Sequence, residues 1–199
     1  MKALRKGKIE SQGKIVFYSL GKLIPVKNFG LAIESLGLLF REYPDFDWEF
    51  HLIGDGIELS RLKTLSETYN ISERIYFEGK LSYEASMKKL ATSDVVIMPG
   101  LKEGWPKVII EGWAAGAVPV VADAGISNTI IQNNVSGFLF KPTIGDLKDT
   151  LRSIFTDSKL LENIRSRGWD EVEKYSLENF SNGVDNICRN RLLLNSKSK

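Results

Sequence analysis

The 199-residue sequence has very little cysteine and histidine, with one residue of each, Cys188 and His51. A single cysteine excludes an internal disulfide, and such usage fits a reducing cytoplasm. One histidine and one cysteine also argue against a zinc-type site built from these ligands. We therefore expect a cytoplasmic protein without a His/Cys metal centre.

Long apolar runs and an excess of charge of one sign are lacking as well. No apolar stretch approaches the roughly 20 residues that span a bilayer, and the basic segment 1–13 is not followed by the apolar stretch of a secretion signal. The net charge of +2, from 27 basic and 25 acidic residues, is too balanced to indicate nucleic-acid binding. We interpret residues 1–13 as a linker or boundary segment, and contact with an anionic membrane surface is the alternative.

The sequence does contain an alternation of short β-type runs and longer amphipathic runs from residue 14 onward. Runs rich in β-branched and aromatic residues predict six strands, at 14–20, 48–54, 74–79, 94–100, 118–123 and 137–140. Apolar residues at helical spacing predict helices between them, at 29–43, 57–70, 83–92, about 106–115 and about 128–133, with Ser82 and Ser127 as N-caps of the third and the fifth. Residues 143–195 are predicted to form further helices, with a break at 174–176.

This order of elements predicts an α/β fold with a Rossmann-like parallel sheet of about six strands and helices on both faces. Runs such as DVVIMPG (94–100) are apolar throughout, as a strand covered on both sides should be. In such sheets, ligands bind beyond the carboxyl ends of the strands. The unusual loops of this sequence follow predicted strands, at 21–27, 54–57, 79–82, 100–105 and 123–127.

Common phosphate-binding fingerprints are missing from these loops. GDGIEL (54–59) has the first two glycines of the dinucleotide pattern but Leu59 where the third belongs, and no Gly-Lys-Ser/Thr phosphate loop occurs. The sequence therefore argues against a nicotinamide-type hydride-transfer enzyme and against a common ATPase. Lys22 and Lys27 instead bracket a loop stiffened by Pro25, where two ammonium groups could clamp a diphosphate. Two solvated loop lysines are the alternative.

The segment LKEGWPKVIIEG carries two glutamates around a predicted helix start. Pro106 suits the first position of a helix, and the N–H group of Lys107 would then face the strand-end cleft and help to bind an anion. Glu103 precedes this helix and Glu111 lies inside it. They are either two groups that hold one ligand, or a favourable acid near the helix start and one exposed helical charge.

Five separated segments occur in the order of one known family: GKLIPVKN, HLIGDG, RIYFEGKLS, SDVVIMPGLKEGWPKVIIEGWAAGAVPVVAD and NVSGFLFKP. With them, the chain resembles the C-terminal, nucleotide-sugar-binding domain of the retaining glycosyltransferase family 4, whose members have the two-domain GT-B fold. The resemblance covers roughly residues 14–175, which we expect to form a donor-binding domain. It rests on the agreement of all five motifs, since two glutamates at this spacing are weak evidence alone.

The resemblance implies a role for each matched position. Lys22 and Lys27 match the basic pair that binds the donor diphosphate, and Glu103 matches the glutamate that approaches the hydroxyls of the donor sugar; these three are the implied catalytic residues. Glu111 matches the glutamate that holds the ribose. The other implied donor-binding positions are Gly21, Gly54, Glu78, Lys80, Leu81, Gly104, Trp105 and Lys107, with the loop at 78–81 framing the base.

Two departures from the family pattern stand out. Where many members read Glu-Gly-Phe-Gly, this chain reads Glu-Gly-Trp-Pro, which removes one backbone donor and is expected to alter sugar preference. We expect that an N-terminal domain, which in full-length members binds the acceptor, is not part of this chain. Residues 176–199 resemble the helix that crosses toward that domain.

The resemblance implies a glycosyltransferase that moves a glycosyl group from a UDP- or GDP-sugar to a hydroxyl of a saccharide or lipid-linked acceptor. No metal or further cofactor is required in this scheme, the chain alone is expected to be inactive, and the full-length enzyme could lie at the inner membrane face. A non-catalytic nucleotide-sugar-binding module or partner-dependent subunit is the main alternative, and a sugar epimerase is a minor one.

Some conspicuous residues are expected to be structural. His51 is predicted to lie in the core or at a strand end, with a ligand-facing role as the alternative. Trp48, Trp113 and Trp169 are expected to pack, whereas Trp105 stays a candidate for the site.

Overall fold

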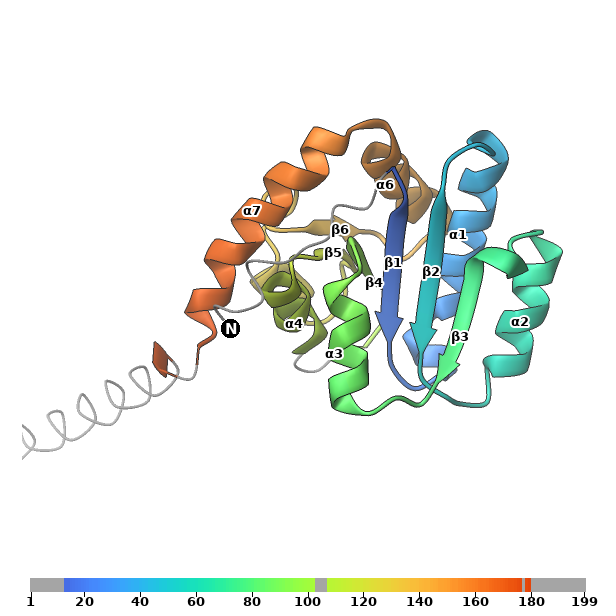
Figure 1. Cartoon of the computed structure of the whole chain (residues 1–199), viewed down its shortest axis with the longest axis horizontal. Coiled ribbons are helices and arrows are strands. Elements are labelled where there is room, and N and C mark those ends of the chain that lie inside the picture. The colour runs from blue at the N-terminus through green and yellow to red at the C-terminus, as the bar shows by residue number, and fades with distance from the viewer. Residues whose placement is uncertain (1–12, 103–106, 177, 180–199) are drawn as a thin grey trace, which may run out of the picture.

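The computed structural model describes residues 13–102, 107–176 and 178–179 (Figure 1). Its strands are β1 (Ile15–Leu20), β2 (Trp48–Ile53), β3 (Ile75–Gly79), β4 (Val95–Met98), β5 (Val118–Ala122) and β6 (Phe138–Phe140). Its α-helices are α1 (Phe29–Glu42), α2 (Leu59–Thr68), α3 (Tyr83–Ala91), α4 (Lys107–Ala115), α5 (Ser127–Ile130), α6 (Ile144–Thr156) and α7 (Ser158–Lys174). Two short 3-10 helices, η2 (Pro25–Lys27) and η3 (Ser72–Arg74), complete the described elements.

The six strands form one parallel sheet in the order β3-β2-β1-β4-β5-β6. The predicted fold class is therefore confirmed. Strands β2 and β3 lie on one side of β1, and β4, β5 and β6 lie on the other. The strand order therefore reverses between β1 and β4. Such a switch point is where open parallel sheets bind ligands.

Helices cover both faces of this sheet, and each face has its own apolar core. Side chains of α1, α2 and α6 fill one core, around Phe17 and Phe50, whereas α3 and α4 cover the other, around Tyr18 and Val96. Helix α7 contributes to both, and in Figure 1 it runs beyond α4 at the end of the sheet near β6. The sheet is therefore buried between two layers, which explains why β4 and β5 are apolar at every position.

Most predicted boundaries agree with the structure to within two or three residues, including the break at 174–176 where α7 ends, and one local prediction was wrong. Ser82 caps α3 as predicted, by accepting a hydrogen bond from the Ala85 N–H at 3.2 Å. Ser127, however, is the first residue of α5 and not its cap, because its hydroxyl donates to the Ala122 carbonyl at 2.7 Å. The predicted helical stretch from 143 also has an earlier break at Asp157, whose side chain accepts from the Leu160 N–H and caps α7.

A buried ion pair joins α7 to the sheet. Asp94, only 3% exposed, accepts a hydrogen bond from the Val16 N–H at 3.0 Å and another from Arg165 Nη2 at 3.1 Å. The single carboxylate thus connects the start of β1, the start of β4 and the middle of α7. Removing one partner of a buried pair is destabilising, and without Asp94 the Arg165 guanidinium would keep only its ion pair with the exposed Glu162 carboxylate.

We expect Asp94→Ala to be among the more destabilising single substitutions in the chain. The loss should be about 3–5 kcal/mol, which corresponds to a fall in Tm of roughly 10 °C for a chain of this length. Thermal unfolding followed by circular dichroism measures it. Asp94→Asn, which keeps an oxygen for Val16, should lose less, and an Asp94→Ala variant with the wild-type Tm would contradict this role.

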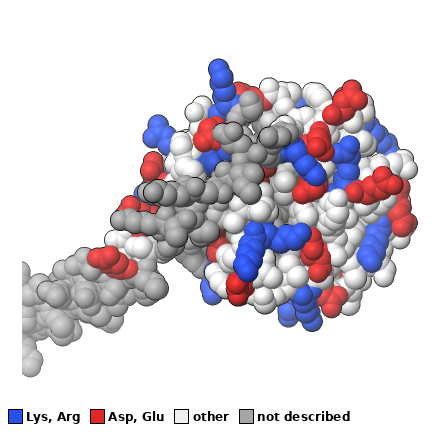
Figure 2. Space-filling model, in the orientation of Figure 1, with Lys and Arg blue, Asp and Glu red and all other residues white. Residues whose placement is uncertain are grey.

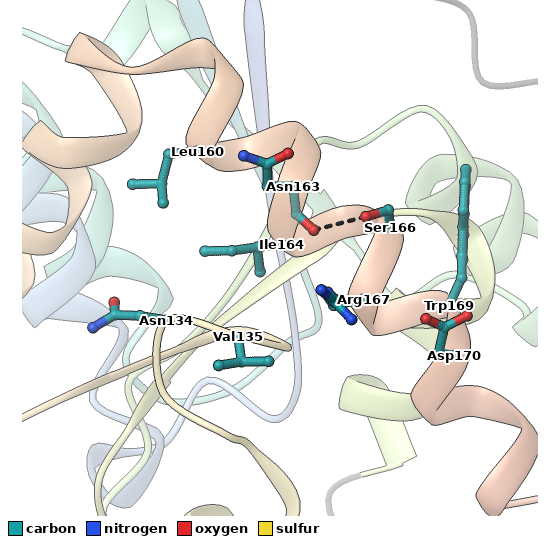
Figure 3. A pocket seen from close by; sticks show the side chains of 9 residues that line it. All are labelled: Asn134, Val135, Leu160, Asn163, Ile164, Ser166, Arg167, Trp169 and Asp170. Atoms are coloured by element: carbon teal, nitrogen blue, oxygen red, sulfur yellow. Dashed lines mark hydrogen bonds between the residues drawn. The ribbon is translucent and has the colours of Figure 1, made fainter.

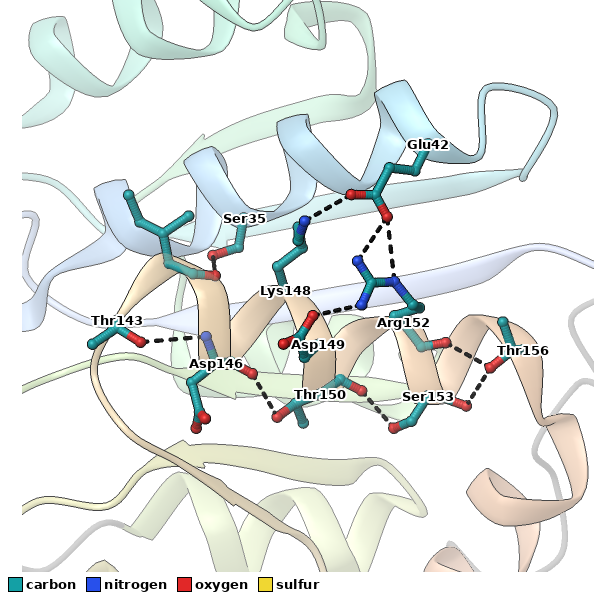
Figure 4. Close-up of polar contacts among 11 residues, drawn as sticks. Ser35, Glu42, Thr143, Asp146, Lys148, Asp149, Thr150, Arg152, Ser153 and Thr156 are labelled. Atoms are coloured by element: carbon teal, nitrogen blue, oxygen red, sulfur yellow. Dashed lines mark hydrogen bonds and ion pairs between the residues drawn. The ribbon is translucent and has the colours of Figure 1, made fainter.

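The exposed ion pairs between α1 and α6 provide the matched comparison (Figure 4). Glu42 on α1 accepts hydrogen bonds from Lys148 Nζ and Arg152 Nη2 of α6, both at 2.7 Å. These hydrogen bonds hold the pKa of Glu42 below its ordinary value, yet the pairs are open to solvent and to screening by salt. Glu42→Gln should therefore lower Tm far less than Asp94→Ala, and by less still in high salt.

Strand β6 ends the sheet on one side, and side chains accept hydrogen bonds from an outward N–H group of the strand and from that of the residue after it. The Leu139 N–H donates to Asn133 Oδ1 at 2.8 Å, and the Lys141 N–H donates to Asp146 Oδ2 at 2.6 Å. Both acceptors come from the loops or helices that flank the strand in sequence.

Candidate functional site

Loops that follow four different strands are tied together at the carboxyl edge of the sheet. The Leu23 N–H donates to the Asp55 carbonyl at 3.0 Å, the Gly54 N–H to the Gly79 carbonyl at 2.8 Å, and the Leu101 N–H to the Val26 carbonyl at 3.0 Å. In Figure 1 this edge lies at the tips of the β1, β2 and β3 arrows. The strand-end loops that the sequence singled out therefore form one continuous surface.

Two predicted glycines, Gly21 and Gly54, meet at the centre of this surface. Gly54 has a φ of +140°, and a Cβ atom at this position would lie 1.8 Å from the Gly21 carbonyl oxygen. A side chain at Gly21 would lie 3.3 Å from the Phe29 ring and 3.8 Å from Cε of Lys27. These glycines allow the loops after β1 and β2 to cross closely, so their role is to shape the surface.

Both predicted lysines lie on the segment between β1 and α1. Lys22 is exposed, and Lys27 is half-buried at the end of η2, with its stem over Gly21. Their charges therefore stand at the carboxyl end of β1, next to the switch point of the sheet. This placement is compatible with the predicted diphosphate-binding pair, which stays a prediction.

Glu111 lies where β1, α3 and α4 meet, between two tyrosines. The pKa of Tyr18 is raised to about 12, mainly by burial and to a smaller extent by the negative charge of Glu111. The same charge is the largest cause of the raised pKa of Tyr83, the first residue of α3, which is 71% exposed. Glu111 itself is half-buried. It is therefore neither the plain exposed charge of the alternative interpretation nor sealed in the core.

Tyr83 was not among the residues predicted for this site. The available signal was an aromatic residue directly after the N-cap Ser82, at the start of a helix that follows a strand-end loop. Its exposure is notable because Ile57 and Leu101, 82% and 44% exposed, also lie in strand-end loops of this edge.

The closeness of Glu111 and Tyr83 can be tested without any ligand. In Glu111→Gln the negative charge is gone, so the Tyr83 phenol should lose its proton more easily, and its pKa should fall toward the ordinary value of about 10. Ultraviolet titration of tyrosinate measures this. The titration curve of Tyr83 alone is obtained by subtracting the curve of Tyr83→Phe, once in the wild type and once in Glu111→Gln. If the Tyr83 curve is the same in both, Glu111 does not contact Tyr83.

The loop predicted to frame the base contains Glu78, Lys80 and Leu81, and their side chains lie differently. The Glu78 carboxylate is engaged inside the domain, with Oε1 at 2.6 Å from both His51 Nδ1 and Lys89 Nζ. Lys80 is exposed, with its Nζ 3.9 Å from Asp55 Oδ2. Leu81 is half-buried against the core of the α3 face. Of the three, Lys80 is the one free to turn toward a ligand.

Several of the remaining predictions concern residues at or near the start of α4. Lys107 is exposed and begins this helix. Glu103, Gly104, Trp105 and Pro106 lie outside the described residues, so their predicted roles stay predictions.

The predicted structural residues behave mostly as expected. Trp48 and Trp113 are 1% exposed, and His51 is 8% exposed in the middle of β2, which confirms their packing roles. Trp169 is half-buried and borders a cleft of about 1060 Å³ between α7 and the turn at Asn134–Val135 (Figure 3). This turn precedes β6, so the cleft lies toward the amino edge of the sheet, away from the predicted site residues.

Metal ligands, surface charge and membrane-spanning helices give three further findings for the described part of the chain. Over residues 13–102, 107–176 and 178–179, no group of three or more His, Cys, Asp or Glu side chains is placed to hold a metal ion. Acidic and basic side chains alternate over the face shown in Figure 2 and do not gather by sign. None of the described helices combines the length and apolar character needed to cross a membrane.

Comparison with known families identifies the chain. Residues 1–170 match the family model described as Glycosyl transferases group 1. The chain belongs to this family. The family assignment expected from the five sequence motifs is therefore confirmed.

The chain is similar to curated glycosyl transferases group 1 relatives of greater length. It is 25% identical over 193 residues to GDP-Man:Man(3)GlcNAc(2)-PP-Dol alpha-1,2-mannosyltransferase of Dictyostelium discoideum, covering 91% of this chain and 38% of that protein. It is 28% identical over 174 residues to UDP-Gal:alpha-D-GlcNAc-diphosphoundecaprenol alpha-1,3-galactosyltransferase of Escherichia coli, covering 83% of this chain and 44% of that protein. The chain thus spans less than half the length of these relatives.

Solved structures share the fold. Alr3699/HepE of Anabaena, in complex with UDP, matches with a TM-score of 0.79 and 20% identity over 89% of this chain and 49% of that one. The C-terminal domain of a glycosyl transferase group 1 family protein (LpcC) from Francisella tularensis matches with a TM-score of 0.72 and 23% identity, over 88% of this chain and 92% of that one. The isolated domain in the second structure has nearly the extent of this chain.

Proposed function

We propose that this chain is the donor-binding domain of a retaining glycosyltransferase of the GT-B type. Its substrate would be a nucleoside-diphosphate sugar, and the acceptor a hydroxyl of a saccharide or of a lipid-linked sugar. The observation that carries the proposal is the placement of Glu111, Lys22 and Lys27 around one switch point of a parallel sheet. The relatives include a GDP-mannose and a UDP-galactose enzyme, which supports a UDP- or GDP-sugar as the donor.

The side chains divide the donor between them in this proposal. Glu111 accepts hydrogen bonds from the ribose hydroxyls. Lys22 and Lys27 neutralise the diphosphate together with the first N–H groups of α4, so no metal ion is assigned a role. Glu103, outside the described residues, approaches the sugar hydroxyls, and Gly104, Trp105 and Lys107 border the sugar and the diphosphate.

The reaction proposed for the whole enzyme exchanges one bond for another at the anomeric carbon. The bond from this carbon to the diphosphate oxygen breaks, a bond to the acceptor oxygen forms on the same face, and the hydroxyl proton passes to the departing phosphate. The lysines contribute by stabilising the negative charge that develops on this leaving group.

The domain limits belong to the same proposal. Residues 14–175 form the donor domain, 1–13 form a linker, and 176–199 form a segment that crosses toward an N-terminal domain that binds the acceptor. The whole enzyme would work in the cytoplasm, at the inner membrane face when its acceptor is lipid-linked. The chain of 199 residues would then transfer no sugar by itself.

Calorimetric titration of the 199-residue chain with UDP and with GDP tests this function. We expect weak binding of at least one nucleotide, with a Kd near or below about 1 mM. A folded chain that binds neither nucleotide at millimolar concentration would overturn the donor-domain proposal. Measurable sugar transfer by the purified chain would overturn the proposed need for a second domain.

A further inference from the structure

One face of the sheet carries a cluster of charged side chains where apolar packing is the rule. The His51 cluster consists of Lys14, Glu49, His51, Glu78 and Lys89. Glu49 and His51 are two residues apart on β2, Glu78 lies on β3, and Lys89 reaches them from α3. Such alternate positions point to the same face of a sheet, here the face that α3 covers.

The contacts within the His51 cluster are short and charge-assisted. His51 Nδ1 lies 2.6 Å from Glu78 Oε1, and Nε2 lies 3.0 Å from Glu49 Oε1. Lys89 Nζ lies 2.6 Å from the same Glu78 oxygen, and Lys14 forms an ion pair with Glu49. The His51 ring also stacks on Tyr76, with centroids 4.8 Å apart. Charge-assisted hydrogen bonds of this kind are stronger and more directional than neutral ones.

Glu78 is the centre of this cluster, and it is held as a carboxylate. Burial alone would raise the pKa of Glu78, but the hydrogen bonds from Lys89 and His51 together outweigh burial and hold the pKa below its ordinary value. Its side chain is 21% exposed and those of His51 and Lys89 are 10% and 37% exposed, so water competes only in part for these contacts.

The Glu78–Lys89 pair spans the loop that joins β3 to α3. This loop leaves β3 through Gly79, whose φ is +67°, and enters α3 through the N-cap Ser82. Its start is bonded to the loop after β2, because the Gly79 carbonyl accepts from the Gly54 N–H at 2.8 Å. The ion pair therefore fixes the position of α3 relative to β3, and with it the place of Tyr83 beside Glu111.

We propose that Glu78, His51 and Lys89 are positioning residues for the nucleoside half of the donor site. They act through the 79–82 loop and Tyr83, and do not touch the nucleotide themselves. This inference rests on the proposed function, since it concerns how the same site holds its ligand. It assigns Glu78 a supporting role in place of the direct donor-binding role that the family resemblance implied.

Two neighbouring lysines on α3 provide a matched test. Lys89 pairs with the half-buried Glu78, whereas Lys88 pairs with Glu84 at 2.9 Å in solvent, with side chains 77% and 80% exposed. Lys89→Gln and Lys88→Gln remove the same charge from the same helix. UDP and pyrophosphate are the two probes, because only UDP carries a nucleoside, and GDP takes the place of UDP if the wild type prefers it.

We expect Lys89→Gln to lose about fivefold or more in UDP affinity, while its pyrophosphate affinity stays within about twofold of wild type, close to the scatter expected of independent sites. Lys88→Gln should change neither affinity. Lys89→Arg, which keeps the charge, should recover most of the UDP affinity. Tm is measured for each variant, so that a loss of stability is read separately, and Glu78→Gln replaces Lys89→Gln if that variant does not fold.

Two results would overturn the inference while leaving the proposed function intact. One is a UDP affinity in Lys89→Gln equal to that of wild type. The other is an equal loss for UDP and pyrophosphate, which would indicate general disruption of the carboxyl edge. A wild-type chain that binds neither UDP nor GDP is a different failure, because it overturns the proposed function itself.

Discussion

The Glu111→Ala variant should bind UDP or GDP at least about tenfold more weakly than the wild-type chain. The reason is that a hydrogen bond to a charged group contributes about 1.5–3 kcal/mol, and about 1.4 kcal/mol corresponds to a factor of ten in Kd. A half-buried carboxylate next to Tyr18 and Tyr83 is placed to accept such bonds from a ribose. Calorimetry with the nucleotide that the wild type prefers measures the loss.

The same experiment separates the ribose contact from the diphosphate contact. Pyrophosphate affinity should survive in Glu111→Ala, because no ribose is present, and it should even rise slightly with the loss of a negative charge. Lys22→Gln should behave differently, because it removes a charge from the diphosphate site. It should lower the affinity for pyrophosphate and the affinity for the nucleotide to a similar extent. Glu84→Ala, an exposed acid on α3, is the control for charge alone. If Glu111→Ala binds nucleotide as tightly as wild type, the ribose assignment is wrong.

The second large effect concerns Gly54. Gly54→Ala should destabilise the chain by at least about 3 kcal/mol, for two reasons. Alanine is strained at this backbone conformation, and its Cβ would collide with a backbone atom, which no side-chain rotation can relieve. The added Cβ would lie 1.8 Å from the Gly21 carbonyl oxygen. Either the two loops separate, or the domain unfolds. The fall in Tm, by about 6 °C or more at this chain length, is the measurement.

Gly79 is the matched control for this substitution. It has a left-handed φ of +67°, but no atom lies within 4 Å of where its Cβ would be. Gly79→Ala thus isolates the cost of backbone strain, which should be about 1–2 kcal/mol. Nearly equal losses in the two variants would show that the close crossing of the loops after β1 and β2 is relieved at little cost.

The architecture of this chain was predictable because its strands differ in kind from its helices. DVVIMPG and VPVVAD are short and apolar at nearly every position, which is the pattern of a strand covered on both faces. The order of elements then fixed a parallel sheet, and a parallel sheet fixes which loops gather at its carboxyl edge. That is why the sequence alone predicts that Lys22, Lys27 and Glu111 lie at one edge of the sheet.

What the sequence left unpredicted depends on contacts between residues distant in the chain. Glu78 sits next to the loop that frames the site, yet its side chain points into the domain because Lys89 and His51 offer two close partners. Ser127 resembles a helix cap in the sequence, but its hydroxyl donates to the Ala122 carbonyl at the end of β5 and does not cap α5. Tyr83 becomes informative only once α3 and α4 bring it beside Glu111.

The two side-chain acceptors along β6 have a consequence for the behaviour of the protein in solution. A terminal strand normally offers free N–H groups as a template on which another chain can add a strand. Here Asn133 and Asp146 already accept from the outward N–H groups of Leu139 and Lys141. Growth of the sheet from this side, whether into a fibril or a strand-exchanged dimer, would first have to displace both acceptors, so β6 is guarded against self-association.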